Sequence, residues 1–177
     1  MEVITTYSTT VDTANDVQPT GDNLDMQYEQ ERGKPMPSKN HSLIQMEIGF
    51  ELKTQYGSQF DIFPELSLDL IPGQQGAVPD LCIYNKAPRD WDNDVIKTKE
   101  PPLLAIEILS PRQIFDDITD KIKNIYFPAG MKSAWVVLPS VQSVMLFRPN
   151  QKTVAYNQGI LKDDASGFEL NIDKIFS

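Results

Sequence analysis

Residues 103–111 of the chain, LLAIEILSP, are apolar apart from Glu107 near the centre and Ser110 and Pro111 at the end. A run that is apolar at odd and even positions predicts a central strand, here residues 103–109, covered on both faces. An ionised carboxylate in such a strand is costly unless it is paired, protonated or bound to a metal. Glu107 therefore either pairs with a cation from a covering helix or belongs to a functional site, and the residue types leave both readings open.

Two further strands are predicted before this run. Residues 60–70 alternate apolar and polar side chains after Pro64, which suggests an edge strand or a bulge. Residues 78–84 form the other strand, in which Pro79 and Asp80 open an apolar segment. Residues 71–76 predict the turn between them, and the polar, proline-bounded segment 85–102 predicts a long loop.

The spacing of apolar residues predicts a helix over residues 41–56, capped by Ser38 or Asn40 and closed by Gly57. A second helix is predicted over residues 114–127, with isoleucine at positions 114, 118, 122 and 125. Residues 133–138 read as a strand, residues 144–148 and 153–156 as a hairpin, and residues 168–172 as a short extended segment. This order predicts an α/β (α+β) domain in which helices flank a mixed β-sheet.

Charge is distributed unevenly along the 177 residues, a length that suits one domain with an additional arm. Residues 1–31 contain seven acids and no base, so the total of −9 leaves −2 for residues 32–177. We therefore expect a flexible acidic N-terminal arm over residues 1–27 and one domain over residues 28–177. A nearly neutral domain does not favour DNA binding by charge alone, but a metal-loaded site would still permit it.

Several classes of protein are excluded by composition. One cysteine, Cys82, rules out an internal disulfide and a four-cysteine zinc site, and one histidine, His41, rules out a multi-histidine metal centre. No run approaches the ~18 apolar residues of a membrane span, so no membrane partner is expected. The first residues lack the basic and apolar regions of a signal peptide, so a cytoplasmic protein is expected.

Two acids and a lysine stand out as candidates for chemistry. Asp80 opens the strand before that of Glu107, so neighbouring strands would each supply one carboxylate, a hard-oxygen set suited to Mg²⁺ or Mn²⁺. Taken alone, Asp80 is more simply a turn aspartate. Lys121 follows on the next helix, where spacing alone favours an exposed pair with Asp117, worth ~0.3–0.5 kcal/mol.

The combination of these residues resembles the Uma-two family of restriction-endonuclease-like proteins, in the PD-(D/E)XK nuclease superfamily. The resemblance rests on Pro79 and Asp80, the run from Glu107 to Pro111, and Lys121 four residues after Asp117. It continues through Tyr126, Gly130 and the segment AWVV at 134–137, and upstream through Met36, Pro37 and His41, covering residues 28–177. The superfamily lysine usually stands two residues after the glutamate, where this chain has Leu109. The segment after Lys121 is also one residue longer than the commonest family spacing.

This resemblance implies a restriction-endonuclease-like core and a metal-dependent DNA endonuclease that hydrolyses phosphodiester bonds. Asp80, Glu107 and the Ile108 carbonyl would hold Mg²⁺ or Mn²⁺, and Lys121 would orient the attacking water or stabilise charge on the phosphate. Apart from the resemblance, Glu65 follows Pro64 on the neighbouring predicted strand and could be a third carboxylate near the metal, although it could equally be an exposed strand acid. Duplex cleavage needs two sites, so a homodimer acting on DNA is expected.

Glu47 and His41 are weaker candidates for the site, and two other functions are alternatives to an endonuclease. Glu47 could face inward from the first helix, between Leu43 and Phe50, and His41 could contact DNA or metal, although it could equally just start the helix. A non-catalytic protein of the same fold, acting in nucleic-acid binding or assembly, is the alternative that the acidic balance favours. A serine hydrolase that uses His41 is a poor reading, because the chain lacks a Gly-x-Ser-x-Gly elbow.

Overall fold

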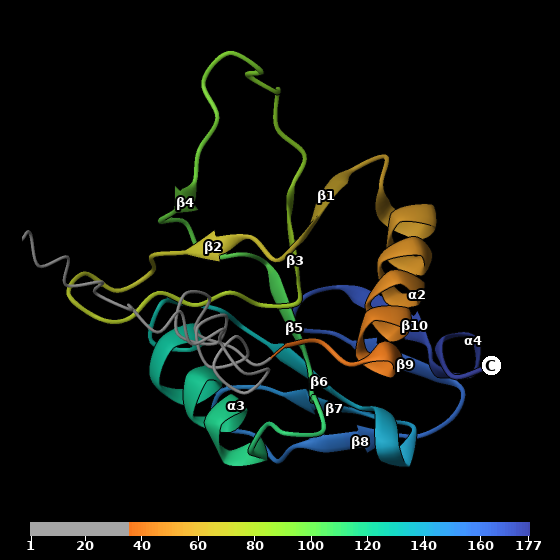
Figure 1. Ribbon diagram of the computed structural model, residues 1–177. Coiled ribbons are helices and arrows are strands. Elements are labelled where there is room, and N and C mark those ends of the chain that lie inside the picture. Colours follow the sequence, from red (N-terminus) through yellow and green to blue (C-terminus); the bar gives the residue numbers. More distant parts are fainter. Residues whose placement is uncertain (1–35) are drawn as a thin grey trace, which may run out of the picture.

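A mixed β-sheet of six strands, in the order β1-β3-β5-β6-β7-β8, organises the protein. The computed structural model describes residues 36–177 (Figure 1). The strands of the sheet are β1 (Phe60–Pro64), β3 (Leu81–Asn85), β5 (Leu104–Ile108), β6 (Ala134–Leu138), β7 (Ser143–Phe147) and β8 (Val154–Tyr156). Of the five pairings, β5 with β6 is parallel and the others are antiparallel. The mixed sheet flanked by helices confirms the predicted fold class.

Strand β5 is buried along its whole length, as its sequence predicts. Leu104, Ile106 and Ile108 pack into one core cluster, whereas Ala105 packs into a second cluster on the opposite face. Since side chains alternate along a strand, Glu107 lies on the same face as Ala105. This alternation places the carboxylate of Glu107 beneath the helix that follows β5.

Helix α2 (Lys39–Tyr56) covers the face of Ile106. Its N-cap is Ser38, whose side chain accepts a hydrogen bond from the His41 backbone N–H, so one of the two predicted caps is correct. Ile44, Ile48 and Leu52 form its buried stripe. The same face is completed by β9 (Ile160–Asp163), β10 (Phe168–Asn171) and α4 (Ile172–Ile175). Strand β9 and the short helix α4 were not predicted.

Helix α3 (Phe115–Lys121) covers the opposite face and continues into a π-helical turn, Ile122–Tyr126 (Figure 1). Ile118, Ile122 and Tyr126 are fully buried against β5 and β6. The predicted helix over residues 114–127 therefore agrees with the structure in extent, but its second half is π-helical. A short 3-10 helix, Pro139–Val141, joins β6 to β7.

The predicted strand over residues 60–70 is broken at Glu65. This residue has φ of 51°, a left-handed conformation that an extended strand does not permit. The chain turns there from β1 into β2 (Ser67–Leu68), which leaves the main sheet and pairs in parallel with β4 (Lys97–Thr98). Strand β4 lies inside the segment predicted as a long loop, whose remainder projects away from the sheet (Figure 1). Within residues 36–177, no helix has the length and apolar character needed to cross a bilayer.

Candidate active site at the ends of strands β3 and β5

Asp80 and Glu107 are brought to the same end of two neighbouring strands. Strand β3 pairs antiparallel with β5, with Leu81 opposite Ile106. Asp80 directly precedes this pair on one chain segment and Glu107 directly follows it on the other. Each residue is only 2% exposed. The two carboxylates therefore enter the site from adjacent strands, as the sequence predicts, and both are removed from bulk water.

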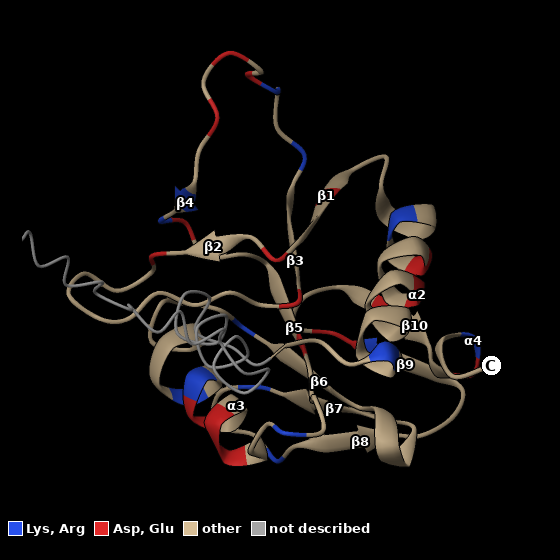
Figure 2. Cartoon of the chain, viewed as in Figure 1, with Lys and Arg blue, Asp and Glu red and all other residues tan. Residues whose placement is uncertain are grey.

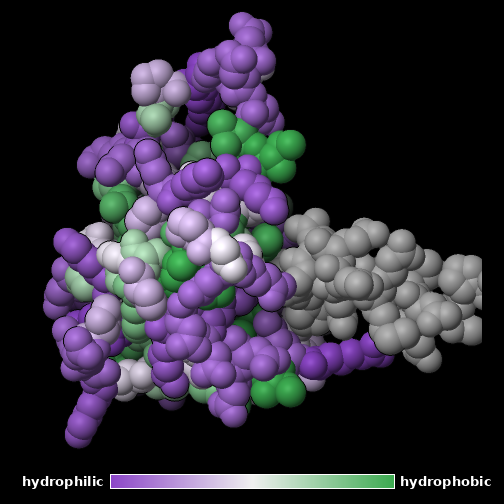
Figure 3. All heavy atoms as spheres, turned by 90° about the vertical axis from the view of Figure 1, so that its left-hand side faces the viewer, coloured by the Kyte–Doolittle hydropathy of each residue, from purple (hydrophilic) through white to green (hydrophobic). Residues whose placement is uncertain are grey.

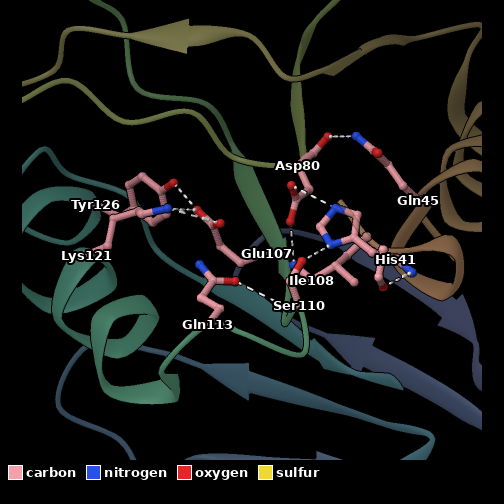
Figure 4. A network of polar contacts seen from close by, with 10 residues as sticks. His41, Gln45, Asp80, Glu107, Ile108, Ser110, Gln113, Lys121 and Tyr126 are labelled. Atoms are coloured by element: carbon pink, nitrogen blue, oxygen red, sulfur yellow. Dashed lines mark hydrogen bonds and ion pairs between the residues drawn. The ribbon is translucent and has the colours of Figure 1, made fainter. Parts of the chain in front are cut away.

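The Asp80 side chain completes the β-ladder where the backbone pairing stops. Its Oδ2 accepts a hydrogen bond of 2.6 Å from the Ile108 backbone N–H, the residue after Glu107. Its backbone carbonyl accepts bonds from the Gln45 side chain at 2.8 Å and from the Glu65 N–H at 3.2 Å. Asp80 is thus fixed to β5 and α2, as Figure 4 shows, and also to the turn after β1.

His41 contacts the other oxygen of Asp80. The imidazole Nε2 lies 3.2 Å from Asp80 Oδ1, and Nδ1 lies 3.0 Å from the Ser110 hydroxyl. All three residues are at most 3% exposed. The structure therefore brings His41, a weak candidate in the sequence, into direct contact with Asp80. Ser110 was not predicted as a site residue, although it belongs to the same run as Glu107.

Glu107 is held by two side chains from the segment after β5. Lys121 Nζ lies 3.1 Å from Oε1 and 3.2 Å from Oε2, and the Tyr126 hydroxyl donates a hydrogen bond to Oε1. The side chain of Lys121 remains 17% exposed, so it is the part of this site most open to solvent. Lys121 thus pairs with Glu107, and no contact between Lys121 and Asp117 is seen.

Burial dominates the acid–base properties of this pair. It raises the pKa of Glu107, with a further rise from the Asp80 charge, while Lys121 and the Tyr126 hydrogen bond act in the opposite direction. Burial also raises the pKa of the Tyr126 hydroxyl, as does the adjacent Glu107 carboxylate. Tyr126 therefore stays protonated and donates to Glu107. The pKa of Glu107 is raised overall, so the effect of burial on this pKa is larger than the opposing effect of the Lys121 ammonium.

The π-helical turn explains how Lys121 and Tyr126 reach one carboxylate. Residues five apart in an α-helix point about 140° away from each other, because a turn takes 3.6 residues. A π turn closes bonds between residues i and i+5, as between Ile122 O and Phe127 N at 3.0 Å. The added residue therefore returns Tyr126 to the side of Lys121. It also matches the segment that is one residue longer than the commonest family spacing.

A cleft lies beside Asp80, between α2 and β1. Its volume is about 560 Å³, and its lining includes Gln45, Gly49, Ile62 and Glu65. Glu65 is partly exposed there, and its backbone N–H donates to the Asp80 carbonyl. The backbone of Glu65 is therefore in contact with Asp80, and Glu65 also lines the cleft. Gln45, one turn after His41 on α2, was not predicted, although its spacing from His41 places both on one helix face.

Glu47 is half-buried on α2, but the two residues expected to point it inward do not pack into the core. Leu43 and Phe50, which flank it on the helix surface, are 56% and 66% exposed. The buried acid of α2 is Glu51, whose carboxylate pairs with Lys174 at 2.7 Å and accepts a bond from Gln55. Lys174 lowers the pKa of Glu51. Glu51 thus forms an ion pair between α2 and α4.

Asp80 and Glu107 suit a divalent cation in donor type and in charge. Their mutual repulsion contributes to the raised pKa of Glu107, and a bound cation would offset it. No group of three or more His, Cys, Asp and Glu side chains within residues 36–177 is arranged to hold a metal ion. Mg²⁺ typically binds through one or two carboxylates and keeps several waters or substrate phosphate oxygens. The pair therefore fits Mg²⁺ as a partial ligand set.

Ser110, His41 and Asp80 contact one another in series, as the residues of a serine hydrolase do. In that chemistry Nε2 faces the serine and Nδ1 faces the carboxylate, whereas here the ring has the reverse orientation. Ser110 is also 3% exposed, which leaves its hydroxyl no access to a substrate. The geometry therefore gives no support to a serine hydrolase.

Comparisons with known proteins support the fold. The chain is similar to a solved structure described as a "putative nuclease belonging to DUF820" from Anabaena variabilis ATCC 29413. The two are 26% identical with a TM-score of 0.69, and the match covers 80% of this chain and 83% of that one. A search of curated proteins gives no significant match. The fold and the site thus define a nuclease-like protein.

The family itself is shown by a match to the Uma2 (Uma-two) model, described as "Putative restriction endonuclease", over residues 19–173. The chain belongs to the Uma2 family, which confirms the resemblance seen in the sequence. The match begins at residue 19, within the segment expected to be an acidic arm. That segment, and with it the expected boundary at residue 28, lies outside the described residues.

Proposed function

We propose that the protein is a Mg²⁺-dependent endonuclease that hydrolyses phosphodiester bonds in DNA. The observation that carries this proposal is the convergence of Asp80, Glu107 and Lys121 at one end of β3 and β5. Two buried carboxylates alone would be costly, and Lys121 alone does not hold the pKa of Glu107 down. A divalent cation is the partner that would make both carboxylates favourable in their ionised form.

Asp80 and Glu107 would hold the metal, with the Ile108 carbonyl and Glu65 as further candidate ligands. A bound Mg²⁺ supplies polarisation of a phosphate oxygen and a lowered pKa for a coordinated water. Ile108 keeps Asp80 oriented through its N–H at 2.6 Å, and Tyr126 keeps Glu107 oriented through its hydroxyl. These contacts fix the carboxylates before substrate arrives, so little reorganisation is needed.

Lys121 would bring positive charge to the reacting phosphate. Its ammonium contacts both oxygens of Glu107 and is the most exposed polar group of the three. From that position it can donate a hydrogen bond to a phosphate oxygen or to the attacking water while it remains beside Glu107. Loss of such a charge-assisted donor typically costs about 10²–10³ in rate.

Cleavage of supercoiled plasmid DNA tests the proposal. We expect nicking with Mg²⁺, loss of nicking with EDTA, and a loss of at least about 100-fold in Asp80→Asn and Lys121→Met. Lys123→Met is the matched control, because Lys123 is exposed two residues along the same helical segment and contacts neither acid. Equal activity in Lys121→Met and Lys123→Met would refute the role of Lys121.

A non-catalytic DNA-binding or assembly protein is the second candidate. The observation that favours it is that both carboxylates already have protein partners, His41 and Ile108 for Asp80 and Lys121 and Tyr126 for Glu107. Such a protein would retard DNA in a gel without cleaving it, and Asp80→Asn would leave that binding unchanged. Cleavage that requires Asp80 would exclude it.

A further inference from the structure

Asp80 contacts the buried His41, which in turn contacts the buried Ser110, and the proposed mechanism uses neither residue. His41 lies in the first turn of α2, and Ser110 lies just after β5, 69 residues away in sequence. The exposed fractions of His41 and Ser110 are each 3%. Burying two polar side chains away from solvent is costly unless their hydrogen-bonding groups are used. Their contacts therefore call for a role.

The start of helix α2 does not require an imidazole at position 41. The N-cap bond runs from the backbone N–H of His41 to the Ser38 hydroxyl, at 3.2 Å. Almost any residue at this position could donate the same bond, because the backbone N–H is common to all residues except proline. The ring itself points inward, toward Ser110 and Asp80 (Figure 4).

The surroundings of the ring decide where its hydrogen lies. Nδ1 is 3.0 Å from Ser110 Oγ, and Nε2 is 3.2 Å from Asp80 Oδ1, a contact that does not have the geometry of a hydrogen bond. If Nδ1 carried the hydrogen of the neutral ring, the lone pair of Nε2 would face a buried carboxylate, which is repulsive. If Ser110 donates to Nδ1, the hydrogen is on Nε2 and faces Asp80.

We propose that Ser110 and His41 are positioning residues that orient Asp80 for metal binding. The Ser110 hydroxyl donates to Nδ1, this bond keeps the hydrogen on Nε2, and Nε2–H faces and attracts Oδ1 of Asp80 without forming a regular hydrogen bond. The Ile108 N–H holds the other oxygen, Oδ2. The run from Glu107 to Ser110 thus supplies one acid of the site and orients the other. The inference rests on the proposed function, in which Asp80 is a metal ligand.

Nitrogen NMR of the full chain tests the first half of this proposal. The protein has one histidine, so all imidazole signals belong to His41. We expect the neutral ring to carry its hydrogen on Nε2 and Ser110→Ala to change both ring-nitrogen signals. Ser133→Ala is the matched control, because Ser133 is a fully buried serine whose hydroxyl makes no hydrogen bond within residues 36–177. A hydrogen on Nδ1 in the wild type, or equal changes in both variants, would overturn the proposal.

Calorimetric titration with Mn²⁺ tests the second half without an activity assay. In His41→Gln the side-chain amide nitrogen can occupy the place of Nε2 and present an N–H to Asp80, whereas in His41→Asn it reaches only the place of Nδ1. We expect Mn²⁺ affinity to fall about 10–100-fold in His41→Asn and Ser110→Ala, and less than about threefold in His41→Gln and Ser133→Ala. Equal affinity in all four variants would refute the positioning role, as would equal losses in His41→Gln and His41→Asn.

Failure of the inference and failure of the proposed function give different results. A wild type that binds no Mn²⁺ overturns the metal site, and the position of the ring hydrogen then decides whether the contacts among Ser110, His41 and Asp80 exist. A wild type that binds Mn²⁺ with unchanged affinity in Ser110→Ala leaves the metal site standing and removes the positioning role. Thermal melting of each variant shows that it is folded, and Ser110→Ala still tests the proposal if His41→Asn does not fold.

Discussion

Glu107 shows the stability cost that comes with the metal-binding role proposed for it. Its carboxylate is 2% exposed within a strand that is otherwise apolar. Lys121 and Tyr126 hold it, yet burial still raises its pKa. If a metal ion from solution binds at this site, the ionised form of Glu107 should be unfavourable before the metal binds, as the raised pKa indicates.

The pH dependence of stability gives a prediction at this scale. The pKa of Glu107 in the folded protein is above its ordinary value of 4.5. The Glu107 carboxyl therefore contributes most to the free energy of unfolding at pH values below 4.5. This contribution is lost as the pH rises through the pKa of Glu107 in the folded protein. Glu107→Gln should therefore gain stability relative to the wild type as pH rises. The measurement is urea unfolding without metal at several pH values between about 4 and 8.

Glu51→Gln is the control with the opposite sign. Lys174 lowers the pKa of Glu51, so this carboxylate stabilises the fold above its ordinary pKa and the contribution is lost as pH falls. Relative to the wild type, Glu51→Gln should thus lose stability as pH rises. If both variants followed the same trend, the raised pKa of Glu107 would be wrong.

Some helices and strands around the site differ from those that the sequence predicts, and the differences occur where residues far apart in the sequence contact one another. Apolar alternation does not reveal that Glu65 breaks a strand, because its left-handed backbone is fixed by contact with Asp80. Helical spacing of isoleucines does not distinguish an α-helix from a π turn over residues 122–126. The local pattern of apolar residues therefore predicts the order of most helices and strands. It does not predict the strand break at Glu65 or the π turn over residues 122–126, which depend on contacts between distant segments.

The same limit applies to the candidate site. Asp80, Glu107 and Lys121 could be predicted from the sequence because their pattern resembles that of a known family. In this pattern one acid lies within an apolar strand, a second acid opens the preceding strand, and a lysine lies on the following helix. The contact between His41 and Ser110 joins residues 69 positions apart, and no local pattern marks it. Tyr126 reads as an ordinary core aromatic until the π turn is seen.

Shortening the π turn tests its role as an element. Deleting the exposed Asn124 places Tyr126 four residues after Lys121, which an α-helix also brings to one face. We expect this deletion to fold with a change in melting temperature of less than about 4 °C. Tyr126→Phe, which removes the donor to Glu107, should cost about 1.5–3 kcal/mol. Unfolding of the deletion variant, or a neutral Tyr126→Phe, would contradict this view of the turn.

At the scale of the whole molecule, charge does not draw DNA to the protein by itself. Lys and Arg are interspersed with Asp and Glu over the described part of the chain (Figure 2). The face shown in Figure 3 is mostly hydrophilic, with apolar atoms in small separate groups. DNA binding should therefore depend on metal at Asp80 and Glu107 more than on a basic surface, and it should weaken when EDTA is added.

Cleavage of both strands requires two sites, and for this reason we propose a homodimer. A single site acting alone should convert supercoiled plasmid to nicked circles before any linear product appears. A dimer on DNA should instead give linear product early, at a rate that rises more steeply than the first power of protein concentration. Gel analysis of the time course across a tenfold dilution series, with light scattering for mass, distinguishes the two. Linear product only after complete nicking would contradict the dimer.

The most direct test of the central claim is calorimetric titration of the wild type and Asp80→Asn with Mn²⁺, without and with a DNA oligonucleotide. Asn can still accept the hydrogen bond from Ile108, so the comparison isolates the charge at the ligand position. Saturable binding in the wild type that weakens at least about 10-fold in Asp80→Asn is the expected result. No binding by the wild type in either condition, or equal binding by both proteins, would contradict a metal-dependent nuclease site at Asp80 and Glu107.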